Sequence, residues 1–193
     1  MKTKPDPRNH SKPILDRFIG SKAIYLLFLL ITLLIYGQTL GFFLGKLDDD
    51  LLIVRPLEFL KNLNNIGTAF MRDAYLNEHG TFYRPLQTVS YMIDAQFFME
   101  RGSVFYLTNL MLHATSGCAL FYLLTLLFPD RKGATLFTLL ILTTPLFVHA
   151  VAWAPARGDL MIGATALLTM IFFIKLMRTG KPHFIPLVIL SYG

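Results

Sequence analysis

The chain has 193 residues, of which 54% are hydrophobic and only 16% are charged, and its net charge is +6. Soluble globular domains carry roughly 25% charged residues, so this composition argues against an ordinary water-soluble domain. The basic residues lack the interleaved aromatic residues of a nucleic-acid-binding groove, so nucleic acid is not an expected partner. A single cysteine leaves no disulfide framework and no cysteine-based metal cluster.

Long uncharged segments decide the fold class. Three of them exceed the roughly 20 residues that cross a hydrocarbon core of about 30 Å, and they predict membrane spans over 23–44, 104–128 and 133–153. A fourth, shorter span is predicted over 160–177, because Asp159 and Lys175 can extend to the interface, and a fifth apolar run begins at residue 182. We therefore expect an all-α, polytopic membrane protein.

The basic residues predict the orientation of the spans. They are concentrated in the N-terminal tail 1–22, between the second and third spans, and between the fourth and fifth spans. Cytoplasmic segments of membrane proteins carry an excess of lysine and arginine, so the tail is predicted to be cytoplasmic and the long loop 45–103 to lie on the opposite face. The first span is too long for the core of a signal peptide, and we expect it to remain uncleaved. The expected localisation is a bacterial inner membrane.

Two short helices are predicted in the outer loop, lying on or dipping into the membrane interface. Pro56 can open the first, over 57–63, which Asn64, Asn65 and Gly67 are expected to end. Pro85 can open the second, over 86–99. The second has two faces at helical spacing: an apolar one with Val89, Ile93 and Phe97, and a polar stripe with Gln87, Ser90 and Asp94.

The residues that could carry chemistry gather on the non-cytoplasmic side. They are an acidic triplet after the first span, an arginine before a proline, a polar pair in the second span and a cluster between the third and fourth spans: Asp48, Asp49, Asp50, Arg84, Asn109, His113, His149, Trp153, Arg157 and Asp159. Adjacent carboxylates can supply a general base or bind a divalent cation, so Asp48 and Asp49 are the predicted site for Mg²⁺ or Mn²⁺. An arginine fork suits a phosphate group.

Each of these residues also has a purely structural interpretation. The triplet could be a solvated helix end, and Trp153 could belong to the interfacial aromatic belt. Arg84 could anchor a lipid phosphate, and His113 could form a hydrogen bond between two helices. Their common side of the membrane favours a functional site for a substrate that is itself a lipid.

Four motifs in this order resemble a known family. They are LDDDLLI at 47–53, YRPL at 83–86 followed by Asp94, LTNLMLH at 107–113, and VAW at 151–153 followed by Arg157 and Asp159. The stretch 40–161 resembles the N-terminal part of GT-C membrane glycosyltransferases, and is most similar to the protein O-mannosyltransferase-like group whose members often carry C-terminal tetratricopeptide repeats. The resemblance implies an inverting transferase that moves a mannose-like hexose from a polyprenyl-phosphate carrier to a hydroxyl of a protein or glycan acceptor on the outer face.

The resemblance also implies a role for each candidate residue. The general base is expected within the acidic triplet, with Asp49 ranked ahead of Asp48 and Asp50. Arg84 and Arg157 are expected at the donor phosphate. The remaining candidates are expected to line the pocket: Asp94, Asn109, His113, His149, Trp153 and Asp159.

Two features depart from the family pattern. The family usually has a His-Pro opening and a glutamate before the tryptophan, whereas Thr144 and His149 occupy those positions here. The family also has many more spans, so we expect the chain to be either a fragment, inactive alone, or a truncated relative that does not catalyse. The alternative class is a non-catalytic membrane component, such as a transporter fragment or an assembly partner. A transporter should place ionisable groups near the bilayer midplane, where only His113 is a candidate, and this modestly favours the transferase.

Overall fold

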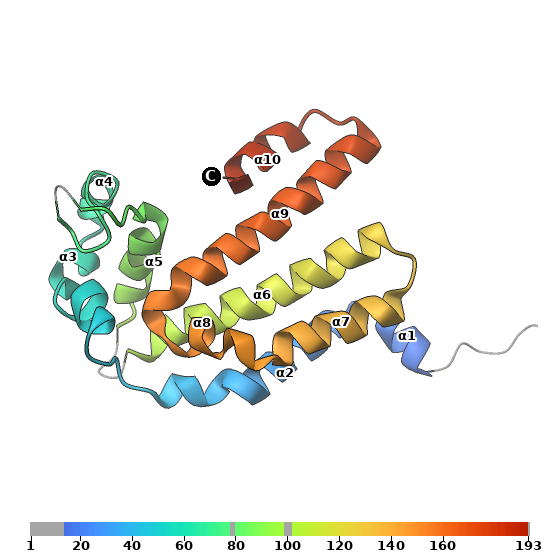
Figure 1. Cartoon of the computed structure of the whole chain (residues 1–193), viewed down its shortest axis with the longest axis horizontal. Coiled ribbons are helices and arrows are strands. Elements are labelled where there is room, and N and C mark those ends of the chain that lie inside the picture. The colour runs from blue at the N-terminus through green and yellow to red at the C-terminus, as the bar shows by residue number, and fades with distance from the viewer. Residues whose placement is uncertain (1–13, 78–79, 99–101, 193) are drawn as a thin grey trace, which may run out of the picture.

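The computed structural model describes residues 14–77, 80–98 and 102–192, and all regular secondary structure in these ranges is helical (Figure 1). Three helices there are long and apolar enough to cross a membrane: Ala23–Gly41, Ser103–Leu127 and Ala154–Thr179. The helices Arg131–Thr143 and Pro145–Ala152 form a bent pair that would be a fourth crossing if both halves belong to one span. Such lengths and compositions are typical of an integral membrane protein.

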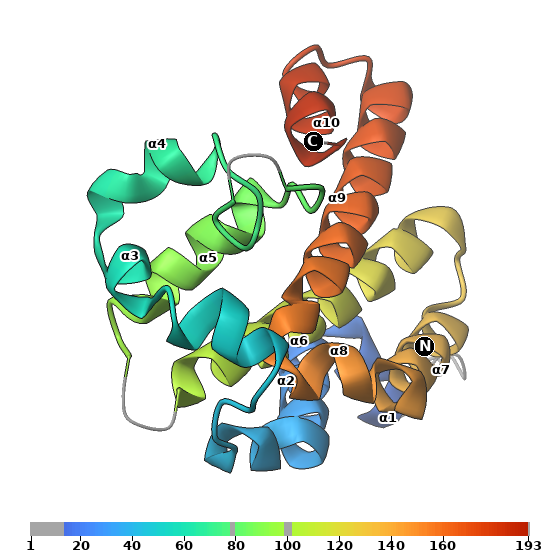
Figure 2. The same cartoon turned by 60° about the vertical axis from the view of Figure 1, so that its left-hand side comes forward.

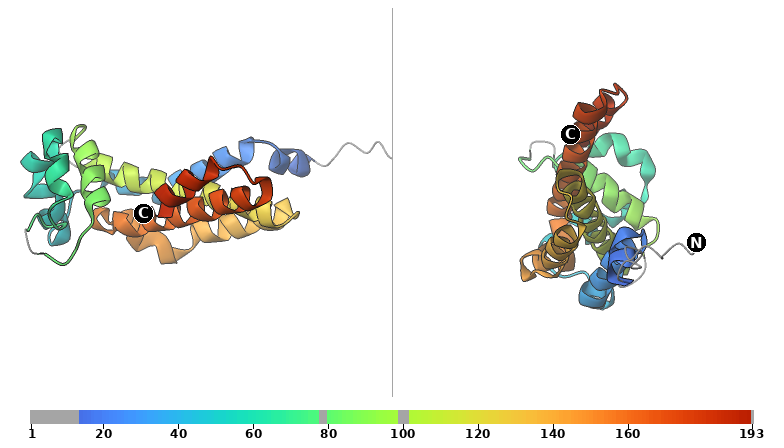
Figure 3. Two further views of the ribbon diagram at one scale, coloured as in Figure 1. Left: turned by 90° about the horizontal axis from the view of Figure 1, so that it is seen from above. Right: turned by 90° about the vertical axis from the view of Figure 1, so that its right-hand side faces the viewer.

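The long helices form a bundle along the long axis of the molecule (Figure 1, Figure 3). They are α2 (Ala23–Tyr36), extended by the 3₁₀ turn η1 (Gly37–Gly41), α6 (Ser103–Leu127), α7 (Arg131–Thr143) and α9 (Arg157–Thr179). Their shared interior is apolar, and the rings of Phe28 and Phe121 meet edge to face with centroids 5.3 Å apart. The last helix, α10 (Phe184–Tyr192), turns back along α9, and the hydroxyls of Thr169 and Ser191 join the two at 2.9 Å.

The end of the bundle at which α7 begins carries basic residues. The short helix α1 (Ile14–Gly20) lies there, and the Arg131 guanidinium donates to the Ile19 carbonyl from Nε at 3.3 Å and from Nη2 at 3.1 Å. Lys132 forms an ion pair with Asp16 at 2.6 Å. These contacts fix α1 against the end of α7.

The third predicted span is broken. Where the uncharged run 133–153 predicted one continuous helix, α7 stops at Thr143 and a bend of 46° separates it from the next helical segment. The cause is Pro145, which lacks a backbone N–H and forces Thr144 into an extended conformation with ψ 135°. A 3₁₀ turn, η4 (Pro145–Phe147), and a short helix, α8 (Val148–Ala152), follow the break.

Between α8 and the last long helix, the chain makes one further 3₁₀ turn, η5 (Ala154–Ala156). Helix α9 then begins at Arg157, earlier than the predicted start at residue 160. The chain is therefore not α-helical from Trp153 to Ala156, a stretch here called the irregular turn, at the end of the bundle nearest the outer loop (Figure 1). This irregular turn brings its side chains against the outer loop.

The outer loop folds into a small helical unit, here called the outer unit (residues 50–95), which sits at one end of the bundle (Figure 2). It contains a π-helical turn, η2 (Asp50–Val54), and then α3 (Leu57–Lys61), η3 (Leu63–Asn65), α4 (Ile66–Ala69) and α5 (Pro85–Ala95). A helix does begin at Leu57, but Gly67 lies inside α4 and does not end helical structure as predicted. The predicted helix 86–99 ends at Ala95, and its last predicted residue, Met99, lies outside the described residues.

Helix α5 has its polar face turned inward. Gln87 and Asp94 are each only 4% exposed, whereas Ile93 is 55% exposed and Phe97, just after the helix, is 67% exposed. The polar stripe finds its partners on α6 and at the start of α9, so the apolar face is left on the outside. An outward apolar face of this kind is typical of a helix at a membrane interface.

Candidate functional site

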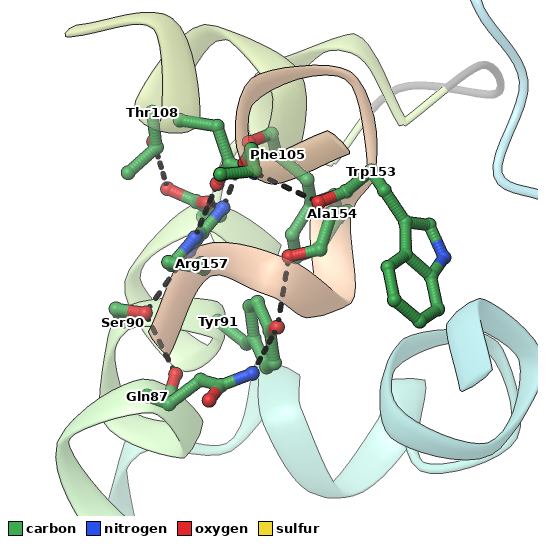
Figure 4. Close-up of polar contacts among 11 residues, drawn as sticks. Gln87, Ser90, Tyr91, Phe105, Thr108, Trp153, Ala154 and Arg157 are labelled. Atoms are coloured by element: carbon green, nitrogen blue, oxygen red, sulfur yellow. Dashed lines mark hydrogen bonds and ion pairs between the residues drawn. The ribbon is translucent and has the colours of Figure 1, made fainter. Parts of the chain in front are cut away.

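A fully buried arginine joins the outer unit to the bundle. Arg157, at the first residue of α9, is 0% exposed, and its Nη2 lies 2.5 Å from Asp94 Oδ2 of α5. Its other donors are also bound: Nε to Asn109 Oδ1 at 2.9 Å, Nη1 to Ser90 Oγ at 3.0 Å, and Nη2 also to the Phe105 carbonyl at 2.8 Å (Figure 4). Arg157 was expected at the donor phosphate, but every one of these contacts is to the protein interior.

The Asp94 carboxylate is likewise bound within the protein. Its Oδ1 accepts a hydrogen bond from Thr108 Oγ1 at 2.7 Å. Burial raises the pKa of the Asp94 carboxyl, and the positive charge of Arg157 opposes that rise. A buried ion pair is tolerated only when additional hydrogen bonds satisfy both partners, and removing one partner leaves an uncompensated charge. We refer to Arg157, Asp94, Asn109, Ser90 and Thr108 as the arginine cluster.

The arginine cluster and two residues of α5 hold the irregular turn that follows α8. The carbonyl of Trp153 accepts from Asn109 Nδ2 at 3.1 Å, that of Ala154 from the Tyr91 hydroxyl at 3.0 Å, and that of Pro155 from Gln87 Nε2 at 2.9 Å. Burial raises the pKa of the Tyr91 hydroxyl to about 12, so the hydroxyl stays protonated even in mildly alkaline solution. With its backbone fixed, Trp153 directs its indole ring away from the cluster (Figure 4).

The indole faces a pocket of about 330 Å³, here called the outer pocket. Five of its lining residues were predicted as site residues from the sequence: Asp48, Arg84, His149, Trp153 and Asp159. They come from four separate segments of the chain, which the fold brings to one place. The other lining residues were not predicted: Leu52, Ala74, Tyr75, Phe82, Pro155 and Ala156.

The three acidic residues after the first span have different surroundings. Asp48 lines the outer pocket and has no hydrogen-bond or ion-pair partner among the described residues. Asp49 is 3% exposed, and its Oδ2 accepts the Gly45 backbone N–H at 2.6 Å. Asp50 pairs with Arg55 at 2.7 Å. We ranked Asp49 first as the base, but of the three carboxylates it is Asp48 that a ligand in the outer pocket can reach.

The local backbone explains why the three carboxylates have different surroundings. Leu47 has a positive φ of 67°, and the helical segment that follows it begins at Asp48 and becomes the π-helical turn at Asp50, so successive carboxylates of the triplet point to different sides of one helix. Burial raises the pKa of the Asp49 carboxyl, although its bond from Gly45 acts in the opposite direction. Within the described ranges no three histidine, cysteine or acidic side chains gather as ligands for a metal ion, and Asp49 points its Oδ2 at Gly45.

A second hollow adjoins the outer pocket. It has a volume of about 350 Å³ and is here called the membrane groove, because it runs between the start of α5 and the two helices α9 and α10. Apolar side chains of the last two helices line it, among them Met161, Ile162 and Leu190. Arg84 and Asp159 line both the membrane groove and the outer pocket. These two charged side chains therefore mark the junction between an apolar and a polar compartment.

A glycine allows α5 to approach α9 at this junction. A Cβ atom on Gly158 would lie 2.7 Å from Gln87 Oε1 and 3.8 Å from Arg84 Nη1. Gln87 cannot easily withdraw, since its Nε2 is bound to Tyr91 and to the Pro155 carbonyl. The small residue at 158 therefore keeps the junction open.

His113 lies apart from the outer pocket. It is 3% exposed, its Nε2 is 3.3 Å from the Leu142 carbonyl, and its ring packs against Tyr36 and Phe147. It lines an inner cavity of about 140 Å³ between the long helices, which shares only Asp159 with the outer pocket. These contacts match the structural interpretation of His113 as a hydrogen bond between helices. Asn109 and Asp94 likewise belong to the arginine cluster and do not line the outer pocket.

Sequence reasoning missed Tyr75 and Phe82. Both belong to a loop that the buried carboxylate of Asp73 organises, because its Oδ1 accepts the backbone N–H groups of Tyr75 at 3.1 Å and Asn77 at 2.7 Å. The Ala74 N–H then donates to the Phe82 carbonyl at 2.8 Å. An aspartate that bonds the backbone two residues ahead is a recognised turn signal, so Asp73 was an available indication of this loop.

Comparison of the chain with protein-family models, with curated proteins and with solved structures found no match, so the functional conclusion depends on the geometry of the outer pocket and the membrane groove.

Proposed function

We propose that the chain is the N-terminal part of an inverting membrane glycosyltransferase of the GT-C kind, which takes a mannose-like hexose from a polyprenyl-phosphate donor. One observation carries this proposal: Arg84 and Asp159 lie where the apolar membrane groove meets the polar outer pocket. A polyprenyl-phosphate sugar has the same order of parts, namely an apolar chain, an anionic phosphate and a polar sugar. The groove suits the chain, Arg84 the phosphate and the outer pocket the sugar.

Asp48 is the proposed general base. It deprotonates the acceptor hydroxyl, whose oxygen attacks the anomeric carbon of the sugar from the side opposite the phosphate. The bond between the anomeric carbon and the phosphate oxygen breaks, the phosphate leaves with the bonding electrons, and the anomeric configuration is inverted. Arg84 stabilises the leaving phosphate, and it is available because it is exposed and has no ion pair among the described residues. Asp49 and Arg157 do not touch the substrate in this proposal. Asp49 positions the acidic triplet through its bond with Gly45, and Arg157 positions the turn that carries Trp153.

The placement of charge supports a transferase over a transporter. A transporter concentrates ionisable groups near the bilayer midplane, along the path of its substrate. Here the charged residues of the candidate site lie at one end of the bundle, and His113 is bound to a helix carbonyl. We further propose that the end with α1, Arg131 and Lys132 is cytoplasmic, that the outer pocket opens on the other face, and that the membrane is a bacterial inner membrane.

The test is hexose transfer from a polyprenyl-phosphate donor to a peptide or glycan hydroxyl by the chain encoded by the complete gene. Asp48→Asn should lower the rate about 10²–10⁴-fold, because asparagine is nearly isosteric but cannot accept the proton. Asp50→Asn is the matched control. This variant should retain the wild-type rate, since the Asp50 carboxylate forms an ion pair with Arg55 and does not line the outer pocket. Full activity of Asp48→Asn would exclude this assignment of the base, and absence of transfer by the wild-type protein would favour the non-catalytic alternative.

A further inference from the structure

We propose that Trp153 and the paired rings of Tyr75 and Phe82 are the sugar-binding walls of the outer pocket, and that they set its preference for a pyranose. This inference rests on the proposed function, because it concerns the group that the donor would carry into the pocket. It assigns a binding role to three aromatic side chains and no part in proton transfer.

The aromatic residues of the pocket come in two pairs from distant segments. The rings of His149 and Trp153 have centroids 4.7 Å apart, and those of Tyr75 and Phe82 lie edge to face at 5.9 Å. All four line the same pocket as Asp48, Arg84 and Asp159. Aromatic rings and carboxylates therefore share one hollow of about 330 Å³.

This mixture matches the two kinds of surface on a pyranose. The C–H bonds on a face of the sugar ring are apolar and weakly positive, so they pack on the negative face of an aromatic ring. The hydroxyl groups at the ring edge are donors that need acceptors, and ionised carboxylates are the strongest acceptors in proteins. Asp48 and Asp159 have no hydrogen-bond or ion-pair partner within the described part of the chain, so their oxygens are available to such hydroxyls.

The backbone is held in place at two of the three walls, Trp153 and Tyr75, before any ligand arrives. The backbone at Trp153 is fixed through its own carbonyl and through those of Ala154 and Pro155. The Tyr75 backbone is fixed by Asp73. A rigid aromatic wall loses little conformational entropy on binding, which increases affinity. By contrast, the indole N–H of Trp153 donates to no partner among the described residues and is free to bond a hydroxyl.

The competing interpretation of Trp153 is a residue of the interfacial aromatic belt, whose ring would contact lipid. The two interpretations differ in what the indole should sense. A sugar wall responds to a sugar in the pocket, whereas a belt residue responds only to the bilayer. The chain contains a single tryptophan, so its fluorescence reports on this side chain alone.

The experiment uses the purified chain in lipid nanodiscs and two short, soluble probes, citronellyl phosphate and citronellyl-phospho-mannose. We expect both probes to bind in an Arg84-dependent manner by calorimetry, and only the sugar-bearing probe to shift tryptophan emission. Trp153→Ala should weaken binding of the sugar-bearing probe about tenfold, which corresponds to the stacking and burial of one ring. The same variant should bind citronellyl phosphate like the wild-type chain.

Matched variants separate the ring from the fold. Trp153→Phe keeps an aromatic wall and should retain most of the affinity. Phe97→Ala removes an exposed aromatic ring outside the outer pocket and should change neither binding constant. Arg84-dependent binding of the sugar-bearing probe, with no change in emission and no loss in Trp153→Ala, would overturn the sugar wall and leave the proposed function in place. Failure of both probes to bind through Arg84 would overturn the proposed function, and this inference with it.

Discussion

Arg157 and Asp94 form an ion pair in which both side chains are buried, with exposed fractions of 0% and 6%. Because the pair joins α9 to α5, Arg157→Ala should lower the free energy of unfolding by about 3–5 kcal/mol, the typical cost of leaving one buried charge unpaired. Arg157→Lys should not restore stability, since an ammonium cannot serve Asn109, Ser90 and Asp94 with the geometry of a planar fork. Denaturant unfolding in detergent micelles would measure both changes.

The control for this prediction is Asp50→Asn, which breaks the exposed pair with Arg55. Ion pairs of that type contribute about 0–1 kcal/mol, so the loss should be small. The double variant Asp94→Leu with Arg157→Leu should be less destabilised than the sum of the two single variants, because an apolar pair needs no charge compensation. Additive single losses would show that the two residues do not act as a pair.

Asp49 gives a prediction about pH. Its pKa is raised in the folded chain by burial, so the folded state holds this proton more tightly than the unfolded state does. The stability that the neutral carboxyl contributes is complete below the unfolded-state pKa of about 4 and is lost as the pH rises through the raised folded-state value. Asp49→Asn should therefore melt at a higher temperature than the wild-type chain at pH 7, and the difference should shrink towards pH 4. The asparagine Oδ1 can still accept the Gly45 N–H. A lower melting temperature for Asp49→Asn at pH 7 would contradict the burial argument.

Gly158 controls the junction between the two hollows. Gly158→Ala places a Cβ 2.7 Å from Gln87 Oε1, so α5 must shift or Gln87 must leave its partners. We expect a destabilisation of about 1–3 kcal/mol, typical of overpacking, together with weaker binding of citronellyl phosphate by calorimetry. Gly163→Ala in the same helix meets no atom within 4 Å and is the matched control. Equal behaviour of the two variants would mean that the approach of α5 at residue 158 does not matter for the groove.

The orientation can be tested with single cysteines. After Cys118→Ala, an Asn77→Cys variant should react with a membrane-impermeant maleimide in intact cells, because residue 77 is exposed in the outer unit. Lys181→Cys, in the exposed turn between α9 and α10, should react only after permeabilisation. The reverse pattern would place the outer pocket in the cytoplasm and remove the basis for a donor on the outer face.

The sequence predicted the helices well where charge and hydropathy decide them, since the uncharged runs became α2, α6 and α9 with ends close to the expected ones. The break at Thr144 and Pro145 was visible as a dipeptide, but an uninterrupted uncharged run masked its effect. The burial of Arg157 could not be predicted for a different reason. An arginine at the end of a span can face water or the interior, and only the arrangement of α5, α6 and α9 decides between them.

The outer pocket was predicted in part. The motifs gave Asp48, Arg84, His149, Trp153 and Asp159, because each stands near a span end or a proline. The ranking within the acidic triplet could not be predicted, since it depends on contacts that only the fold supplies: Gly45 binds Asp49, Arg55 pairs with Asp50, and Asp48 lines the outer pocket. Tyr75 and Phe82 are ordinary aromatic residues in the sequence, and their place in the pocket depends on a turn at Asp73.

The inward polar face of α5 has a consequence for biogenesis. During synthesis α5 leaves the ribosome before α9, so Asp94 and Gln87 exist for a time without Arg157 and the Pro155 carbonyl. The outer unit cannot complete its interior until α9 has been translated and placed. A nascent chain that has not yet reached residue 157 therefore carries the Asp94 carboxylate without its ion-pair partner.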